Sequence, residues 1–78
     1  MKLLVRNLAR TTTEQELQAI FEKFGDVTSC DLVLDQATGE SKGFGFVEMP
    51  QYDKAKKAML TLNGKPVNGS LIRVKLAE

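Results

Sequence analysis

The sequence contains no histidine, a single cysteine and no long apolar run. A lone cysteine cannot form an internal disulfide, and without histidine it cannot supply the ligands of an ordinary zinc site. Cys30 is therefore read as a small buried apolar residue. A membrane-spanning helix needs about 20 apolar residues, and the N-terminus lacks the apolar core of a signal peptide. We expect a soluble intracellular protein with no metal and no cofactor, cytoplasmic if bacterial and nuclear or cytoplasmic if eukaryotic.

The net charge is also small. Eleven Lys and Arg residues against ten Asp and Glu residues give +1 at pH 7. Bulk basicity therefore does not predict nucleic-acid binding, and any attraction for phosphate must come from how the charges are sorted over the surface. With 78 residues, the chain is expected to form one monomeric domain over residues 1–78, and domains of this size bury only about 60% of their unfolded surface.

Residues 42–49, Lys-Gly-Phe-Gly-Phe-Val-Glu-Met, are the most informative stretch. Read with the period of a strand, one face carries a lysine, two phenylalanines and a glutamate, namely Lys42, Phe44, Phe46 and Glu48. The other face carries two glycines, which allow close approach of another element, together with Val47 and Met49. If this second face is the core, the two rings are exposed beside a cation, and such a surface stacks bases and holds a phosphate. The alternative is an ordinary strand buried on both faces.

This stretch resembles the longer signature of the RNA recognition motif family, K/R-G-F/Y-G/A-F-V-x-F/Y. It departs from the signature only at Met49, which replaces an aromatic residue. Because Met49 falls on the inward face, the departure concerns core packing, where methionine fills irregular gaps. The resemblance implies that Phe46 stacks on a base, that Phe44 stacks or packs against a sugar, and that Lys42 meets a phosphate.

Residues 2–6 are predicted to form the first strand, with Leu3 and Val5 inward and Leu4 and Arg6 outward. Residues 3–8, Leu-Leu-Val-Arg-Asn-Leu, resemble the shorter signature of the same family, whose second residue is usually an aromatic that stacks on a base. Leu4 holds that position and has no π-face. At about 1–3 kcal/mol per stacked base, the replacement lowers the expected affinity by one to two powers of ten.

Apolar residues at helical spacing indicate two helices. The first begins at Thr13 with a capping box completed by Glu16 and is expected to end at Gly25, with an apolar stripe of Leu17, Ile20, Phe21 and Phe24. The second covers residues 51–62, with a buried stripe of Tyr52, Ala55, Ala58, Met59 and Leu62. Its two alanines are expected to approach the glycines of the central strand. On its solvent side lie three lysines that are read as a solvated surface, Lys54, Lys56 and Lys57.

Two further strands complete the pattern. Residues 27–34 form the second strand, with Cys30 and Leu32 toward the helices and Asp31 and Val33 on the open side. Residues 35–41 form a turn in which Gly39 adopts positive φ, and its acids, Asp35 and Glu40, are either contacts to RNA or plain turn residues. After an Asn68-Gly69 turn, residues 71–76 form the last strand, with Ile72, Val74 and Leu76 inward and Leu71, Arg73 and Lys75 outward.

The order of elements, βαββαβ, predicts an α+β ferredoxin-like fold in which two helices cover one face of a four-stranded antiparallel sheet. The open face is expected to be locally positive, because five cations lie on or beside it against two acids, Asp31 and Glu48. The resemblance implies binding of single-stranded RNA without catalysis, and single-stranded DNA stays open as a ligand. The residues expected to contact the nucleic acid are Lys2, Leu4, Arg6, Asn7, Lys42, Phe44, Phe46, Arg73 and Lys75.

Two other function classes fit parts of this pattern, and fold alone does not separate them. A protein-interaction module would use the same open face as an apolar patch, formed by Leu4, Val33, Phe44, Phe46 and Leu71. A small phosphate-ester or acylphosphate hydrolase would share the scaffold. The sequence does not support a hydrolase, because it has no histidine and no cluster of metal ligands. In addition, Glu48 occupies the third glycine position of the G-x-G-x-x-G pattern that begins at Gly43.

Overall fold

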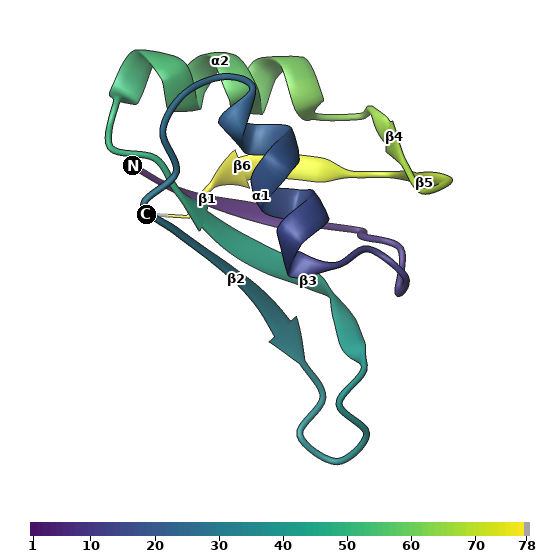
Figure 1. The fold of residues 1–78 in the computed structure, drawn as a ribbon. Coiled ribbons are helices and arrows are strands. Elements are labelled where there is room, and N and C mark those ends of the chain that lie inside the picture. The colour runs from purple at the N-terminus through teal and green to yellow at the C-terminus, as the bar shows by residue number, and fades with distance from the viewer. Residues whose placement is uncertain (78) are drawn as a thin grey trace.

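The structure is a computed structural model and describes residues 1–77. Both helices lie on one side of the main sheet (Figure 1). The hairpin that joins residues 29–34 to residues 41–48 projects beyond the helices, and the molecule measures 37 × 22 × 20 Å. Neither helix among the described residues is long and apolar enough to cross a membrane. The elements are β1 (Lys2–Arg6), α1 (Glu14–Glu22), β2 (Ser29–Leu34), β3 (Ser41–Glu48), α2 (Tyr52–Leu62), β4 (Pro66–Val67), β5 (Ser70–Leu71) and β6 (Arg73–Leu76).

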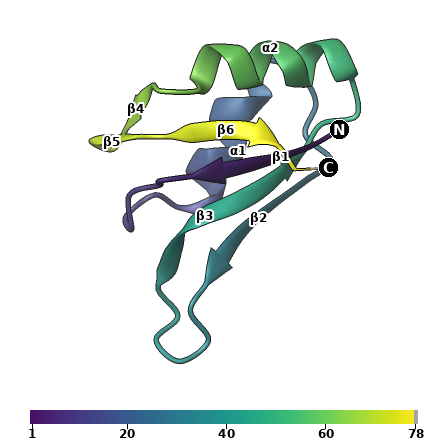
Figure 2. The ribbon, with the colours of Figure 1, turned by 180° about the vertical axis from the view of Figure 1, so that it is seen from behind.

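The main sheet has the strand order β2-β3-β1-β6, and every neighbouring pair is antiparallel. The strands that carry the two signature-like stretches, β1 and β3, therefore lie side by side at its centre. Seen from behind, the four strands lie in front of α1 and no helix covers them (Figure 2). The predicted α+β, ferredoxin-like architecture is confirmed.

The core lies between the sheet and the two helices. It is formed by alternate residues of the strands and the inner stripe of each helix, and its fully buried members include Leu3, Val5, Leu17, Phe21, Val47, Met49, Ala55, Ala58 and Ile72. Met49 is part of this core, as predicted from its place on the inward face, and its N–H donates to the Met1 carbonyl at 3.0 Å. Because alternate residues of β1 and β3 point into this layer, the residues between them must face away from it.

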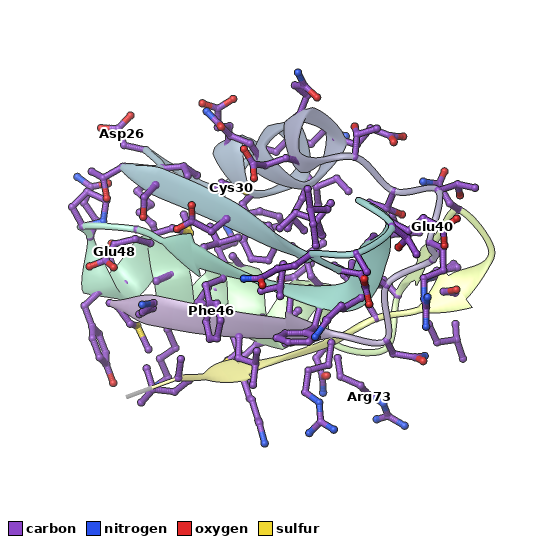
Figure 3. The ribbon with its side chains drawn as sticks, turned by 90° about the horizontal axis from the view of Figure 1, so that it is seen from below. Asp26, Cys30, Glu40, Phe46, Glu48 and Arg73 are labelled. Atoms are coloured by element: carbon purple, nitrogen blue, oxygen red, sulfur yellow. The ribbon has the colours of Figure 1, made fainter. Side chains whose placement is uncertain are left out.

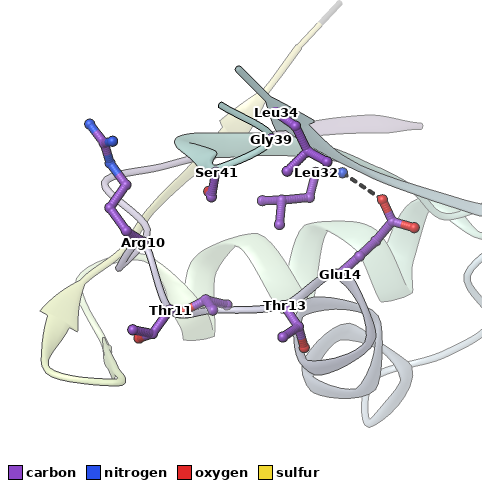
Figure 4. Close-up of a pocket in the computed structure, with 9 residues that line it drawn as sticks. Arg10, Thr11, Thr13, Glu14, Leu32, Leu34, Gly39 and Ser41 are labelled. Atoms are coloured by element: carbon purple, nitrogen blue, oxygen red, sulfur yellow. Dashed lines mark hydrogen bonds between the residues drawn. The ribbon is translucent and has the colours of Figure 1, made fainter. Parts of the chain in front are cut away.

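The start of α1 follows the predicted capping box. The Glu16 N–H donates to Thr13 Oγ1 at 3.1 Å, and the Thr13 N–H donates to Glu16 Oε1 at 3.0 Å. Glu14, the first residue of the helix, also binds β2, because the Leu32 N–H donates to Glu14 Oε2 at 2.9 Å (Figure 4). This bond satisfies a backbone donor on the outer edge of β2, which would otherwise be exposed for pairing with another chain.

The predicted end of α1 is wrong. The helix ends at Glu22, and the Phe24 N–H donates to the Phe21 carbonyl in a tighter turn, so Phe24 follows the helix as a half-buried residue. Gly25 is outside the positive-φ region that a terminating glycine adopts. A Cβ added to it would lie 2.9 Å from the Lys54 Cβ. Glycine is therefore required here because α2 passes close by, which a local pattern cannot reveal.

The inner stripe of α2 is shorter than predicted. Ala55, Ala58 and Leu62 are buried, but Tyr52 is 64% exposed. Helical spacing gives the direction in which a side chain points, and Tyr52 lies in the first turn, beyond the end of the buried stripe. The alanines also do not explain the glycines of β3. A Cβ on Gly45 would lie 2.6 Å from the Asp31 carbonyl oxygen, so the backbone of β2 is what approaches there.

The last part of the chain forms a hairpin and an edge strand. Asn68 and Gly69 both have positive φ, 50° and 85°, and connect β4 to β5 in the predicted two-residue turn. Leu71 pairs in this small ribbon, so β6 begins only at Arg73, just as β2 begins at Ser29 rather than at residue 27. Leu76 is 43% exposed and the prediction that it is buried is wrong, because the last residue of an edge strand has a neighbouring strand on one side only.

Candidate nucleic-acid interface

A row of side chains crosses the open face at the middle of the four strands. Asp31 of β2 pairs with Phe46 of β3, Phe46 pairs with Leu4 of β1, and Leu4 pairs with Lys75 of β6. Directly opposite residues in antiparallel strands have Cβ atoms about 4.5–5.5 Å apart. The row is therefore continuous, and it runs from a carboxylate, over a ring and a leucine, to an ammonium group.

The aromatic part of this face is a pair of half-buried rings. Phe44 and Phe46 contact each other edge to face, with centroids 6.4 Å apart and an interplanar angle of 85°. Together with Leu4 and Arg6 they line a shallow hollow of about 320 Å³. From below, Phe46 lies over the centre of the sheet and Arg73 at its lower edge (Figure 3). The hollow thus combines apolar contact with a cation at its rim.

Lys2 contacts the ring of Phe46. Its Nζ lies 5.0 Å from the ring centroid, in a cation–π geometry. Such a contact is worth about 0.5–1 kcal/mol at an exposed site. A planar group that stacks on this side of Phe46 would compete with the ammonium group for the face of the ring.

Cations gather where β1 ends and β6 begins. Arg6 and Arg73 are direct partners in the pairing of these strands, and like charges in this arrangement repel. With Asn7 and Lys75 they border a hollow of about 510 Å³. An anion bound there would relieve the repulsion between the two guanidinium groups, so the position favours phosphate.

Asn7 has a structural role at this end of the sheet. Its backbone has a positive φ of 59°, and its Nδ2 donates to the Leu71 carbonyl at 2.7 Å. The side chain thereby fastens the chain after β1 to the segment before β6. Among the described residues, no N–H or O–H group donates a hydrogen bond to its amide oxygen, and the side chain is exposed.

The open face and its sequence resemble those of a known group of proteins. The profile of the RNA recognition motif matches residues 3–73. The chain belongs to the RNA recognition motif family. Among curated relatives, it is 42% identical to the chloroplastic Small RNA-binding protein 11 of Arabidopsis thaliana over 77 residues, which is 99% of this chain and 53% of that protein. It is also 42% identical to the mitochondrial Glycine-rich RNA-binding protein 4 of the same plant, over 97% of this chain and 56% of that one. The chain thus spans about half the length of these relatives.

Solved structures of the family share this fold closely. The crystal structure of the RNA-binding protein PG1 is 35% identical with a TM-score of 0.95, and the match covers 100% of this chain and 95% of that one. A Sex-lethal protein in complex with RNA is 31% identical with a TM-score of 0.93, and the match covers 99% of this chain and 46% of that one. The backbone of this RNA recognition motif therefore closely matches the backbones of these two proteins, and one of the two structures is a complex with RNA.

Arg10 belongs to this surface of the RNA recognition motif, although the sequence did not identify it. It borders a hollow of about 290 Å³ together with Arg6, Lys42 and Phe44. Its position follows from a backbone bond of 2.8 Å between the Leu8 N–H and the Gly43 carbonyl, which draws the loop after β1 onto β3. Neither local periodicity nor the family signatures contain this pairing. The only local sign that Arg10 contributes to this surface was its place in the sequence, as a basic residue shortly after the shorter signature.

Asp35, in the loop between β2 and β3, behaves as a turn residue. Its Oδ1 accepts hydrogen bonds from the N–H groups of Thr38 and Ala37, at 3.0 and 2.8 Å, and these bonds hold the pKa of the carboxyl group below its ordinary value. Gly39 has the predicted positive φ, 76°. The carboxylate is thus engaged by its own loop, which supports the interpretation of Asp35 as a turn residue.

A separate hollow lies on the helix side of the sheet. It measures about 400 Å³ and is framed by the loop before α1 and by the β2–β3 hairpin, with Leu32 and Leu34 among its apolar lining residues (Figure 4). Cys30 is buried on this same side, where burial raises the pKa of its thiol to about 11. The thiol is therefore protonated at neutral pH and is a poor nucleophile. Among the described residues, no group of three or more His, Cys, Asp or Glu side chains is placed to hold a metal.

Proposed function

We propose that this RNA recognition motif binds short single-stranded RNA on the open face of its sheet, by base stacking and phosphate contacts and without catalysis. The observation that carries the proposal is the row from Phe46 to Lys75, in which a half-exposed ring and an ammonium group flank Leu4. Proteins that bind single-stranded nucleic acid combine these features, because bases stack on rings while the backbone follows positive charge. The names of the relatives and the RNA complex of a structural neighbour support the same class of ligand.

Each side chain has a stated role in this proposal. Phe46 stacks on one base, and Phe44 stacks on a neighbouring base or packs against its sugar. Lys42 meets a phosphate at one end of the face. At the other end, phosphates or base edges meet the cluster formed by Arg6, Arg73 and Lys75, next to the amide oxygen of Asn7. Leu4 contributes apolar contact only, so we expect micromolar or weaker affinity.

The proposal is tested with Phe46→Ala and a labelled degenerate RNA octamer in fluorescence anisotropy. Since base–aromatic stacking is worth about 1–3 kcal/mol per base, the variant should bind about tenfold or more weakly. Its thermal unfolding should stay cooperative, because the ring is half-exposed rather than part of the core. Unchanged affinity would contradict the proposal, and a loss of cooperative folding would show that the ring supports the core.

A matched pair of charge variants separates this face from the rest of the surface. Arg73→Ala with Lys75→Ala removes two cations from the open face, and Lys56→Ala with Lys57→Ala removes two exposed cations from α2. Only the first pair should weaken binding and flatten its salt dependence, which is about 0.7 per phosphate neutralised on a single strand. Equal effects would indicate unspecific attraction, whereas insensitivity to both pairs would favour a protein partner on the apolar patch. The same octamer made of DNA measures the preference between the two nucleic acids.

A further inference from the structure

Asp31 is an exposed carboxylate next to the ring that is proposed to stack a base. It is the register partner of Phe46 on β2, at the end of the row opposite Lys75. The other acid of the open face, Glu48, is the register partner of Lys2 and so lies across from a cation. Asp31 lies across from a ring instead, and no N–H or O–H group of the described residues donates a hydrogen bond to its carboxylate. It is therefore available to a ligand.

The charge of Asp31 restricts which part of a nucleic acid can approach it. A carboxylate repels phosphate. Of the cations assigned to phosphates or base edges, Arg6, Arg73 and Lys75 lie on β1 and β6, on the far side of Phe46 from β2, and Lys42 lies near the start of β3. The backbone of a bound strand is thus drawn toward β1 and β6. A base that stacks on Phe46 then points its edge toward β2, where Asp31 can contact it.

A carboxylate accepts hydrogen bonds and donates none, so it selects a base by the donors on its edge. Guanine presents N1–H and N2–H side by side, which matches the two oxygens of a carboxylate in a bidentate arrangement. Adenine and cytosine present one amino group beside an acceptor nitrogen. Uracil presents one N–H between two carbonyl oxygens, and these oxygens repel the carboxylate. The complementarity is therefore greatest for guanine.

We propose that Asp31 reads the base stacked on Phe46 and selects guanine at that position. This inference rests on the proposed function, because it requires a base on Phe46. The preference for one base would then come from β2, which carries neither of the two family signatures, through a side chain that does not stack on the base.

The test uses uridine octamers with one variable base, which is guanine, inosine, adenine, cytosine or uracil. Inosine keeps N1–H and lacks the N2 amino group, so it isolates the second hydrogen bond. We expect the guanine octamer to bind about tenfold more tightly than the inosine and uracil octamers, as is typical of a bidentate contact. In Asp31→Asn, the guanine-to-inosine ratio should fall to about two or less.

The matched control is Asp26→Asn, which makes the same change of charge at an exposed position between α1 and β2 (Figure 3). This variant should keep the guanine-to-inosine ratio of the wild type. If Asp31→Asn tightens all five octamers equally and leaves the ratio unchanged, Asp31 acts only by repulsion and the inference is wrong. If the octamers bind but Phe46→Ala has no effect on them, the proposed function itself fails.

Discussion

Leu4 occupies a position on the open face at which the RNA recognition motif family usually has an aromatic residue. It lies in register between Phe46 and Lys75 and is half-buried, so it contacts the ring on one side and borders a cation on the other. Leucine provides apolar surface for a base but lacks the π-face that stacking uses. Of the paired positions 4 and 46 at the centre of the sheet, only position 46 therefore carries a ring, whereas the family usually has an aromatic residue at both.

We predict that Leu4→Phe tightens RNA binding by about tenfold, because it supplies a second ring for stacking. Anisotropy with the degenerate octamer measures the change. Leu60→Phe is the control, since Leu60 is 67% exposed on α2 and away from the open face. Equal affinity of Leu4→Phe and wild type would show that the RNA does not pass over this position.

The direction of single side chains was predictable wherever a strand alternates regularly. Leu4, Phe44 and Phe46 face away from the core as the period of two predicted. Arg10 was not predictable in the same way, because its place on the surface depends on a bond between Leu8 and Gly43, which are far apart in the sequence. Contacts of that kind are set by the approach of whole elements, and a local pattern contains no information about them.

At the scale of elements, α1 shows how local signals fix a boundary. The capping box places the start of the helix at Thr13 as predicted, because both of its hydrogen bonds join residues three positions apart. The end of the helix was mispredicted, since Gly25 is required by the passage of α2 rather than by the helix itself. The Asn68-Gly69 turn was predictable for the same reason as the capping box, since both depend on residues close together in the sequence. Its positive φ angles are ones that Asn and Gly adopt readily.

We predict that Thr13→Ala lowers the free energy of unfolding by about 1 kcal/mol, which is typical for the loss of an N-cap hydroxyl. Chemical denaturation followed by circular dichroism measures this change. RNA affinity should stay the same, because the cap lies on the helix side of the sheet. A variant as stable as the wild type would show that the cap does not hold the helix.

Glu16 should make part of this stability depend on pH. The hydrogen bond from the Thr13 N–H, with smaller contributions from Asn68 and the Thr13 hydroxyl, lowers the pKa of Glu16 from 4.5. A carboxyl group whose pKa is lower in the folded state stabilises it above the unfolded-state pKa, and this contribution is lost as the pH falls through the folded-state pKa. Glu16→Gln keeps a hydrogen-bonding side chain without this titration. The stability advantage of the wild type over the variant should therefore shrink on acidification below the usual glutamate range, and a constant difference would contradict the assignment.

At the scale of the molecule, the distribution of charge matters more than its sum. The net charge is +1, yet Arg6 and Arg73 are direct neighbours at one end of the open face, and Arg10 and Lys42 border the same hollow along the loop after β1. The strand order was predictable from the order of the elements, and it is what brings these residues together. Their exact grouping was not predictable, because it depends on where loops fold back onto strands.

The most direct test of RNA binding on the open sheet is an NMR titration of the domain with a degenerate single-stranded RNA octamer at low and at moderate salt. We expect amide shifts concentrated in residues 2–7, 42–48 and 73–75, with the outer side of α2 unchanged and all shifts weaker at the higher salt concentration. Shifts centred on α2, or a spectrum that does not move at either salt concentration, would contradict the assignment of the open sheet as an RNA-binding surface.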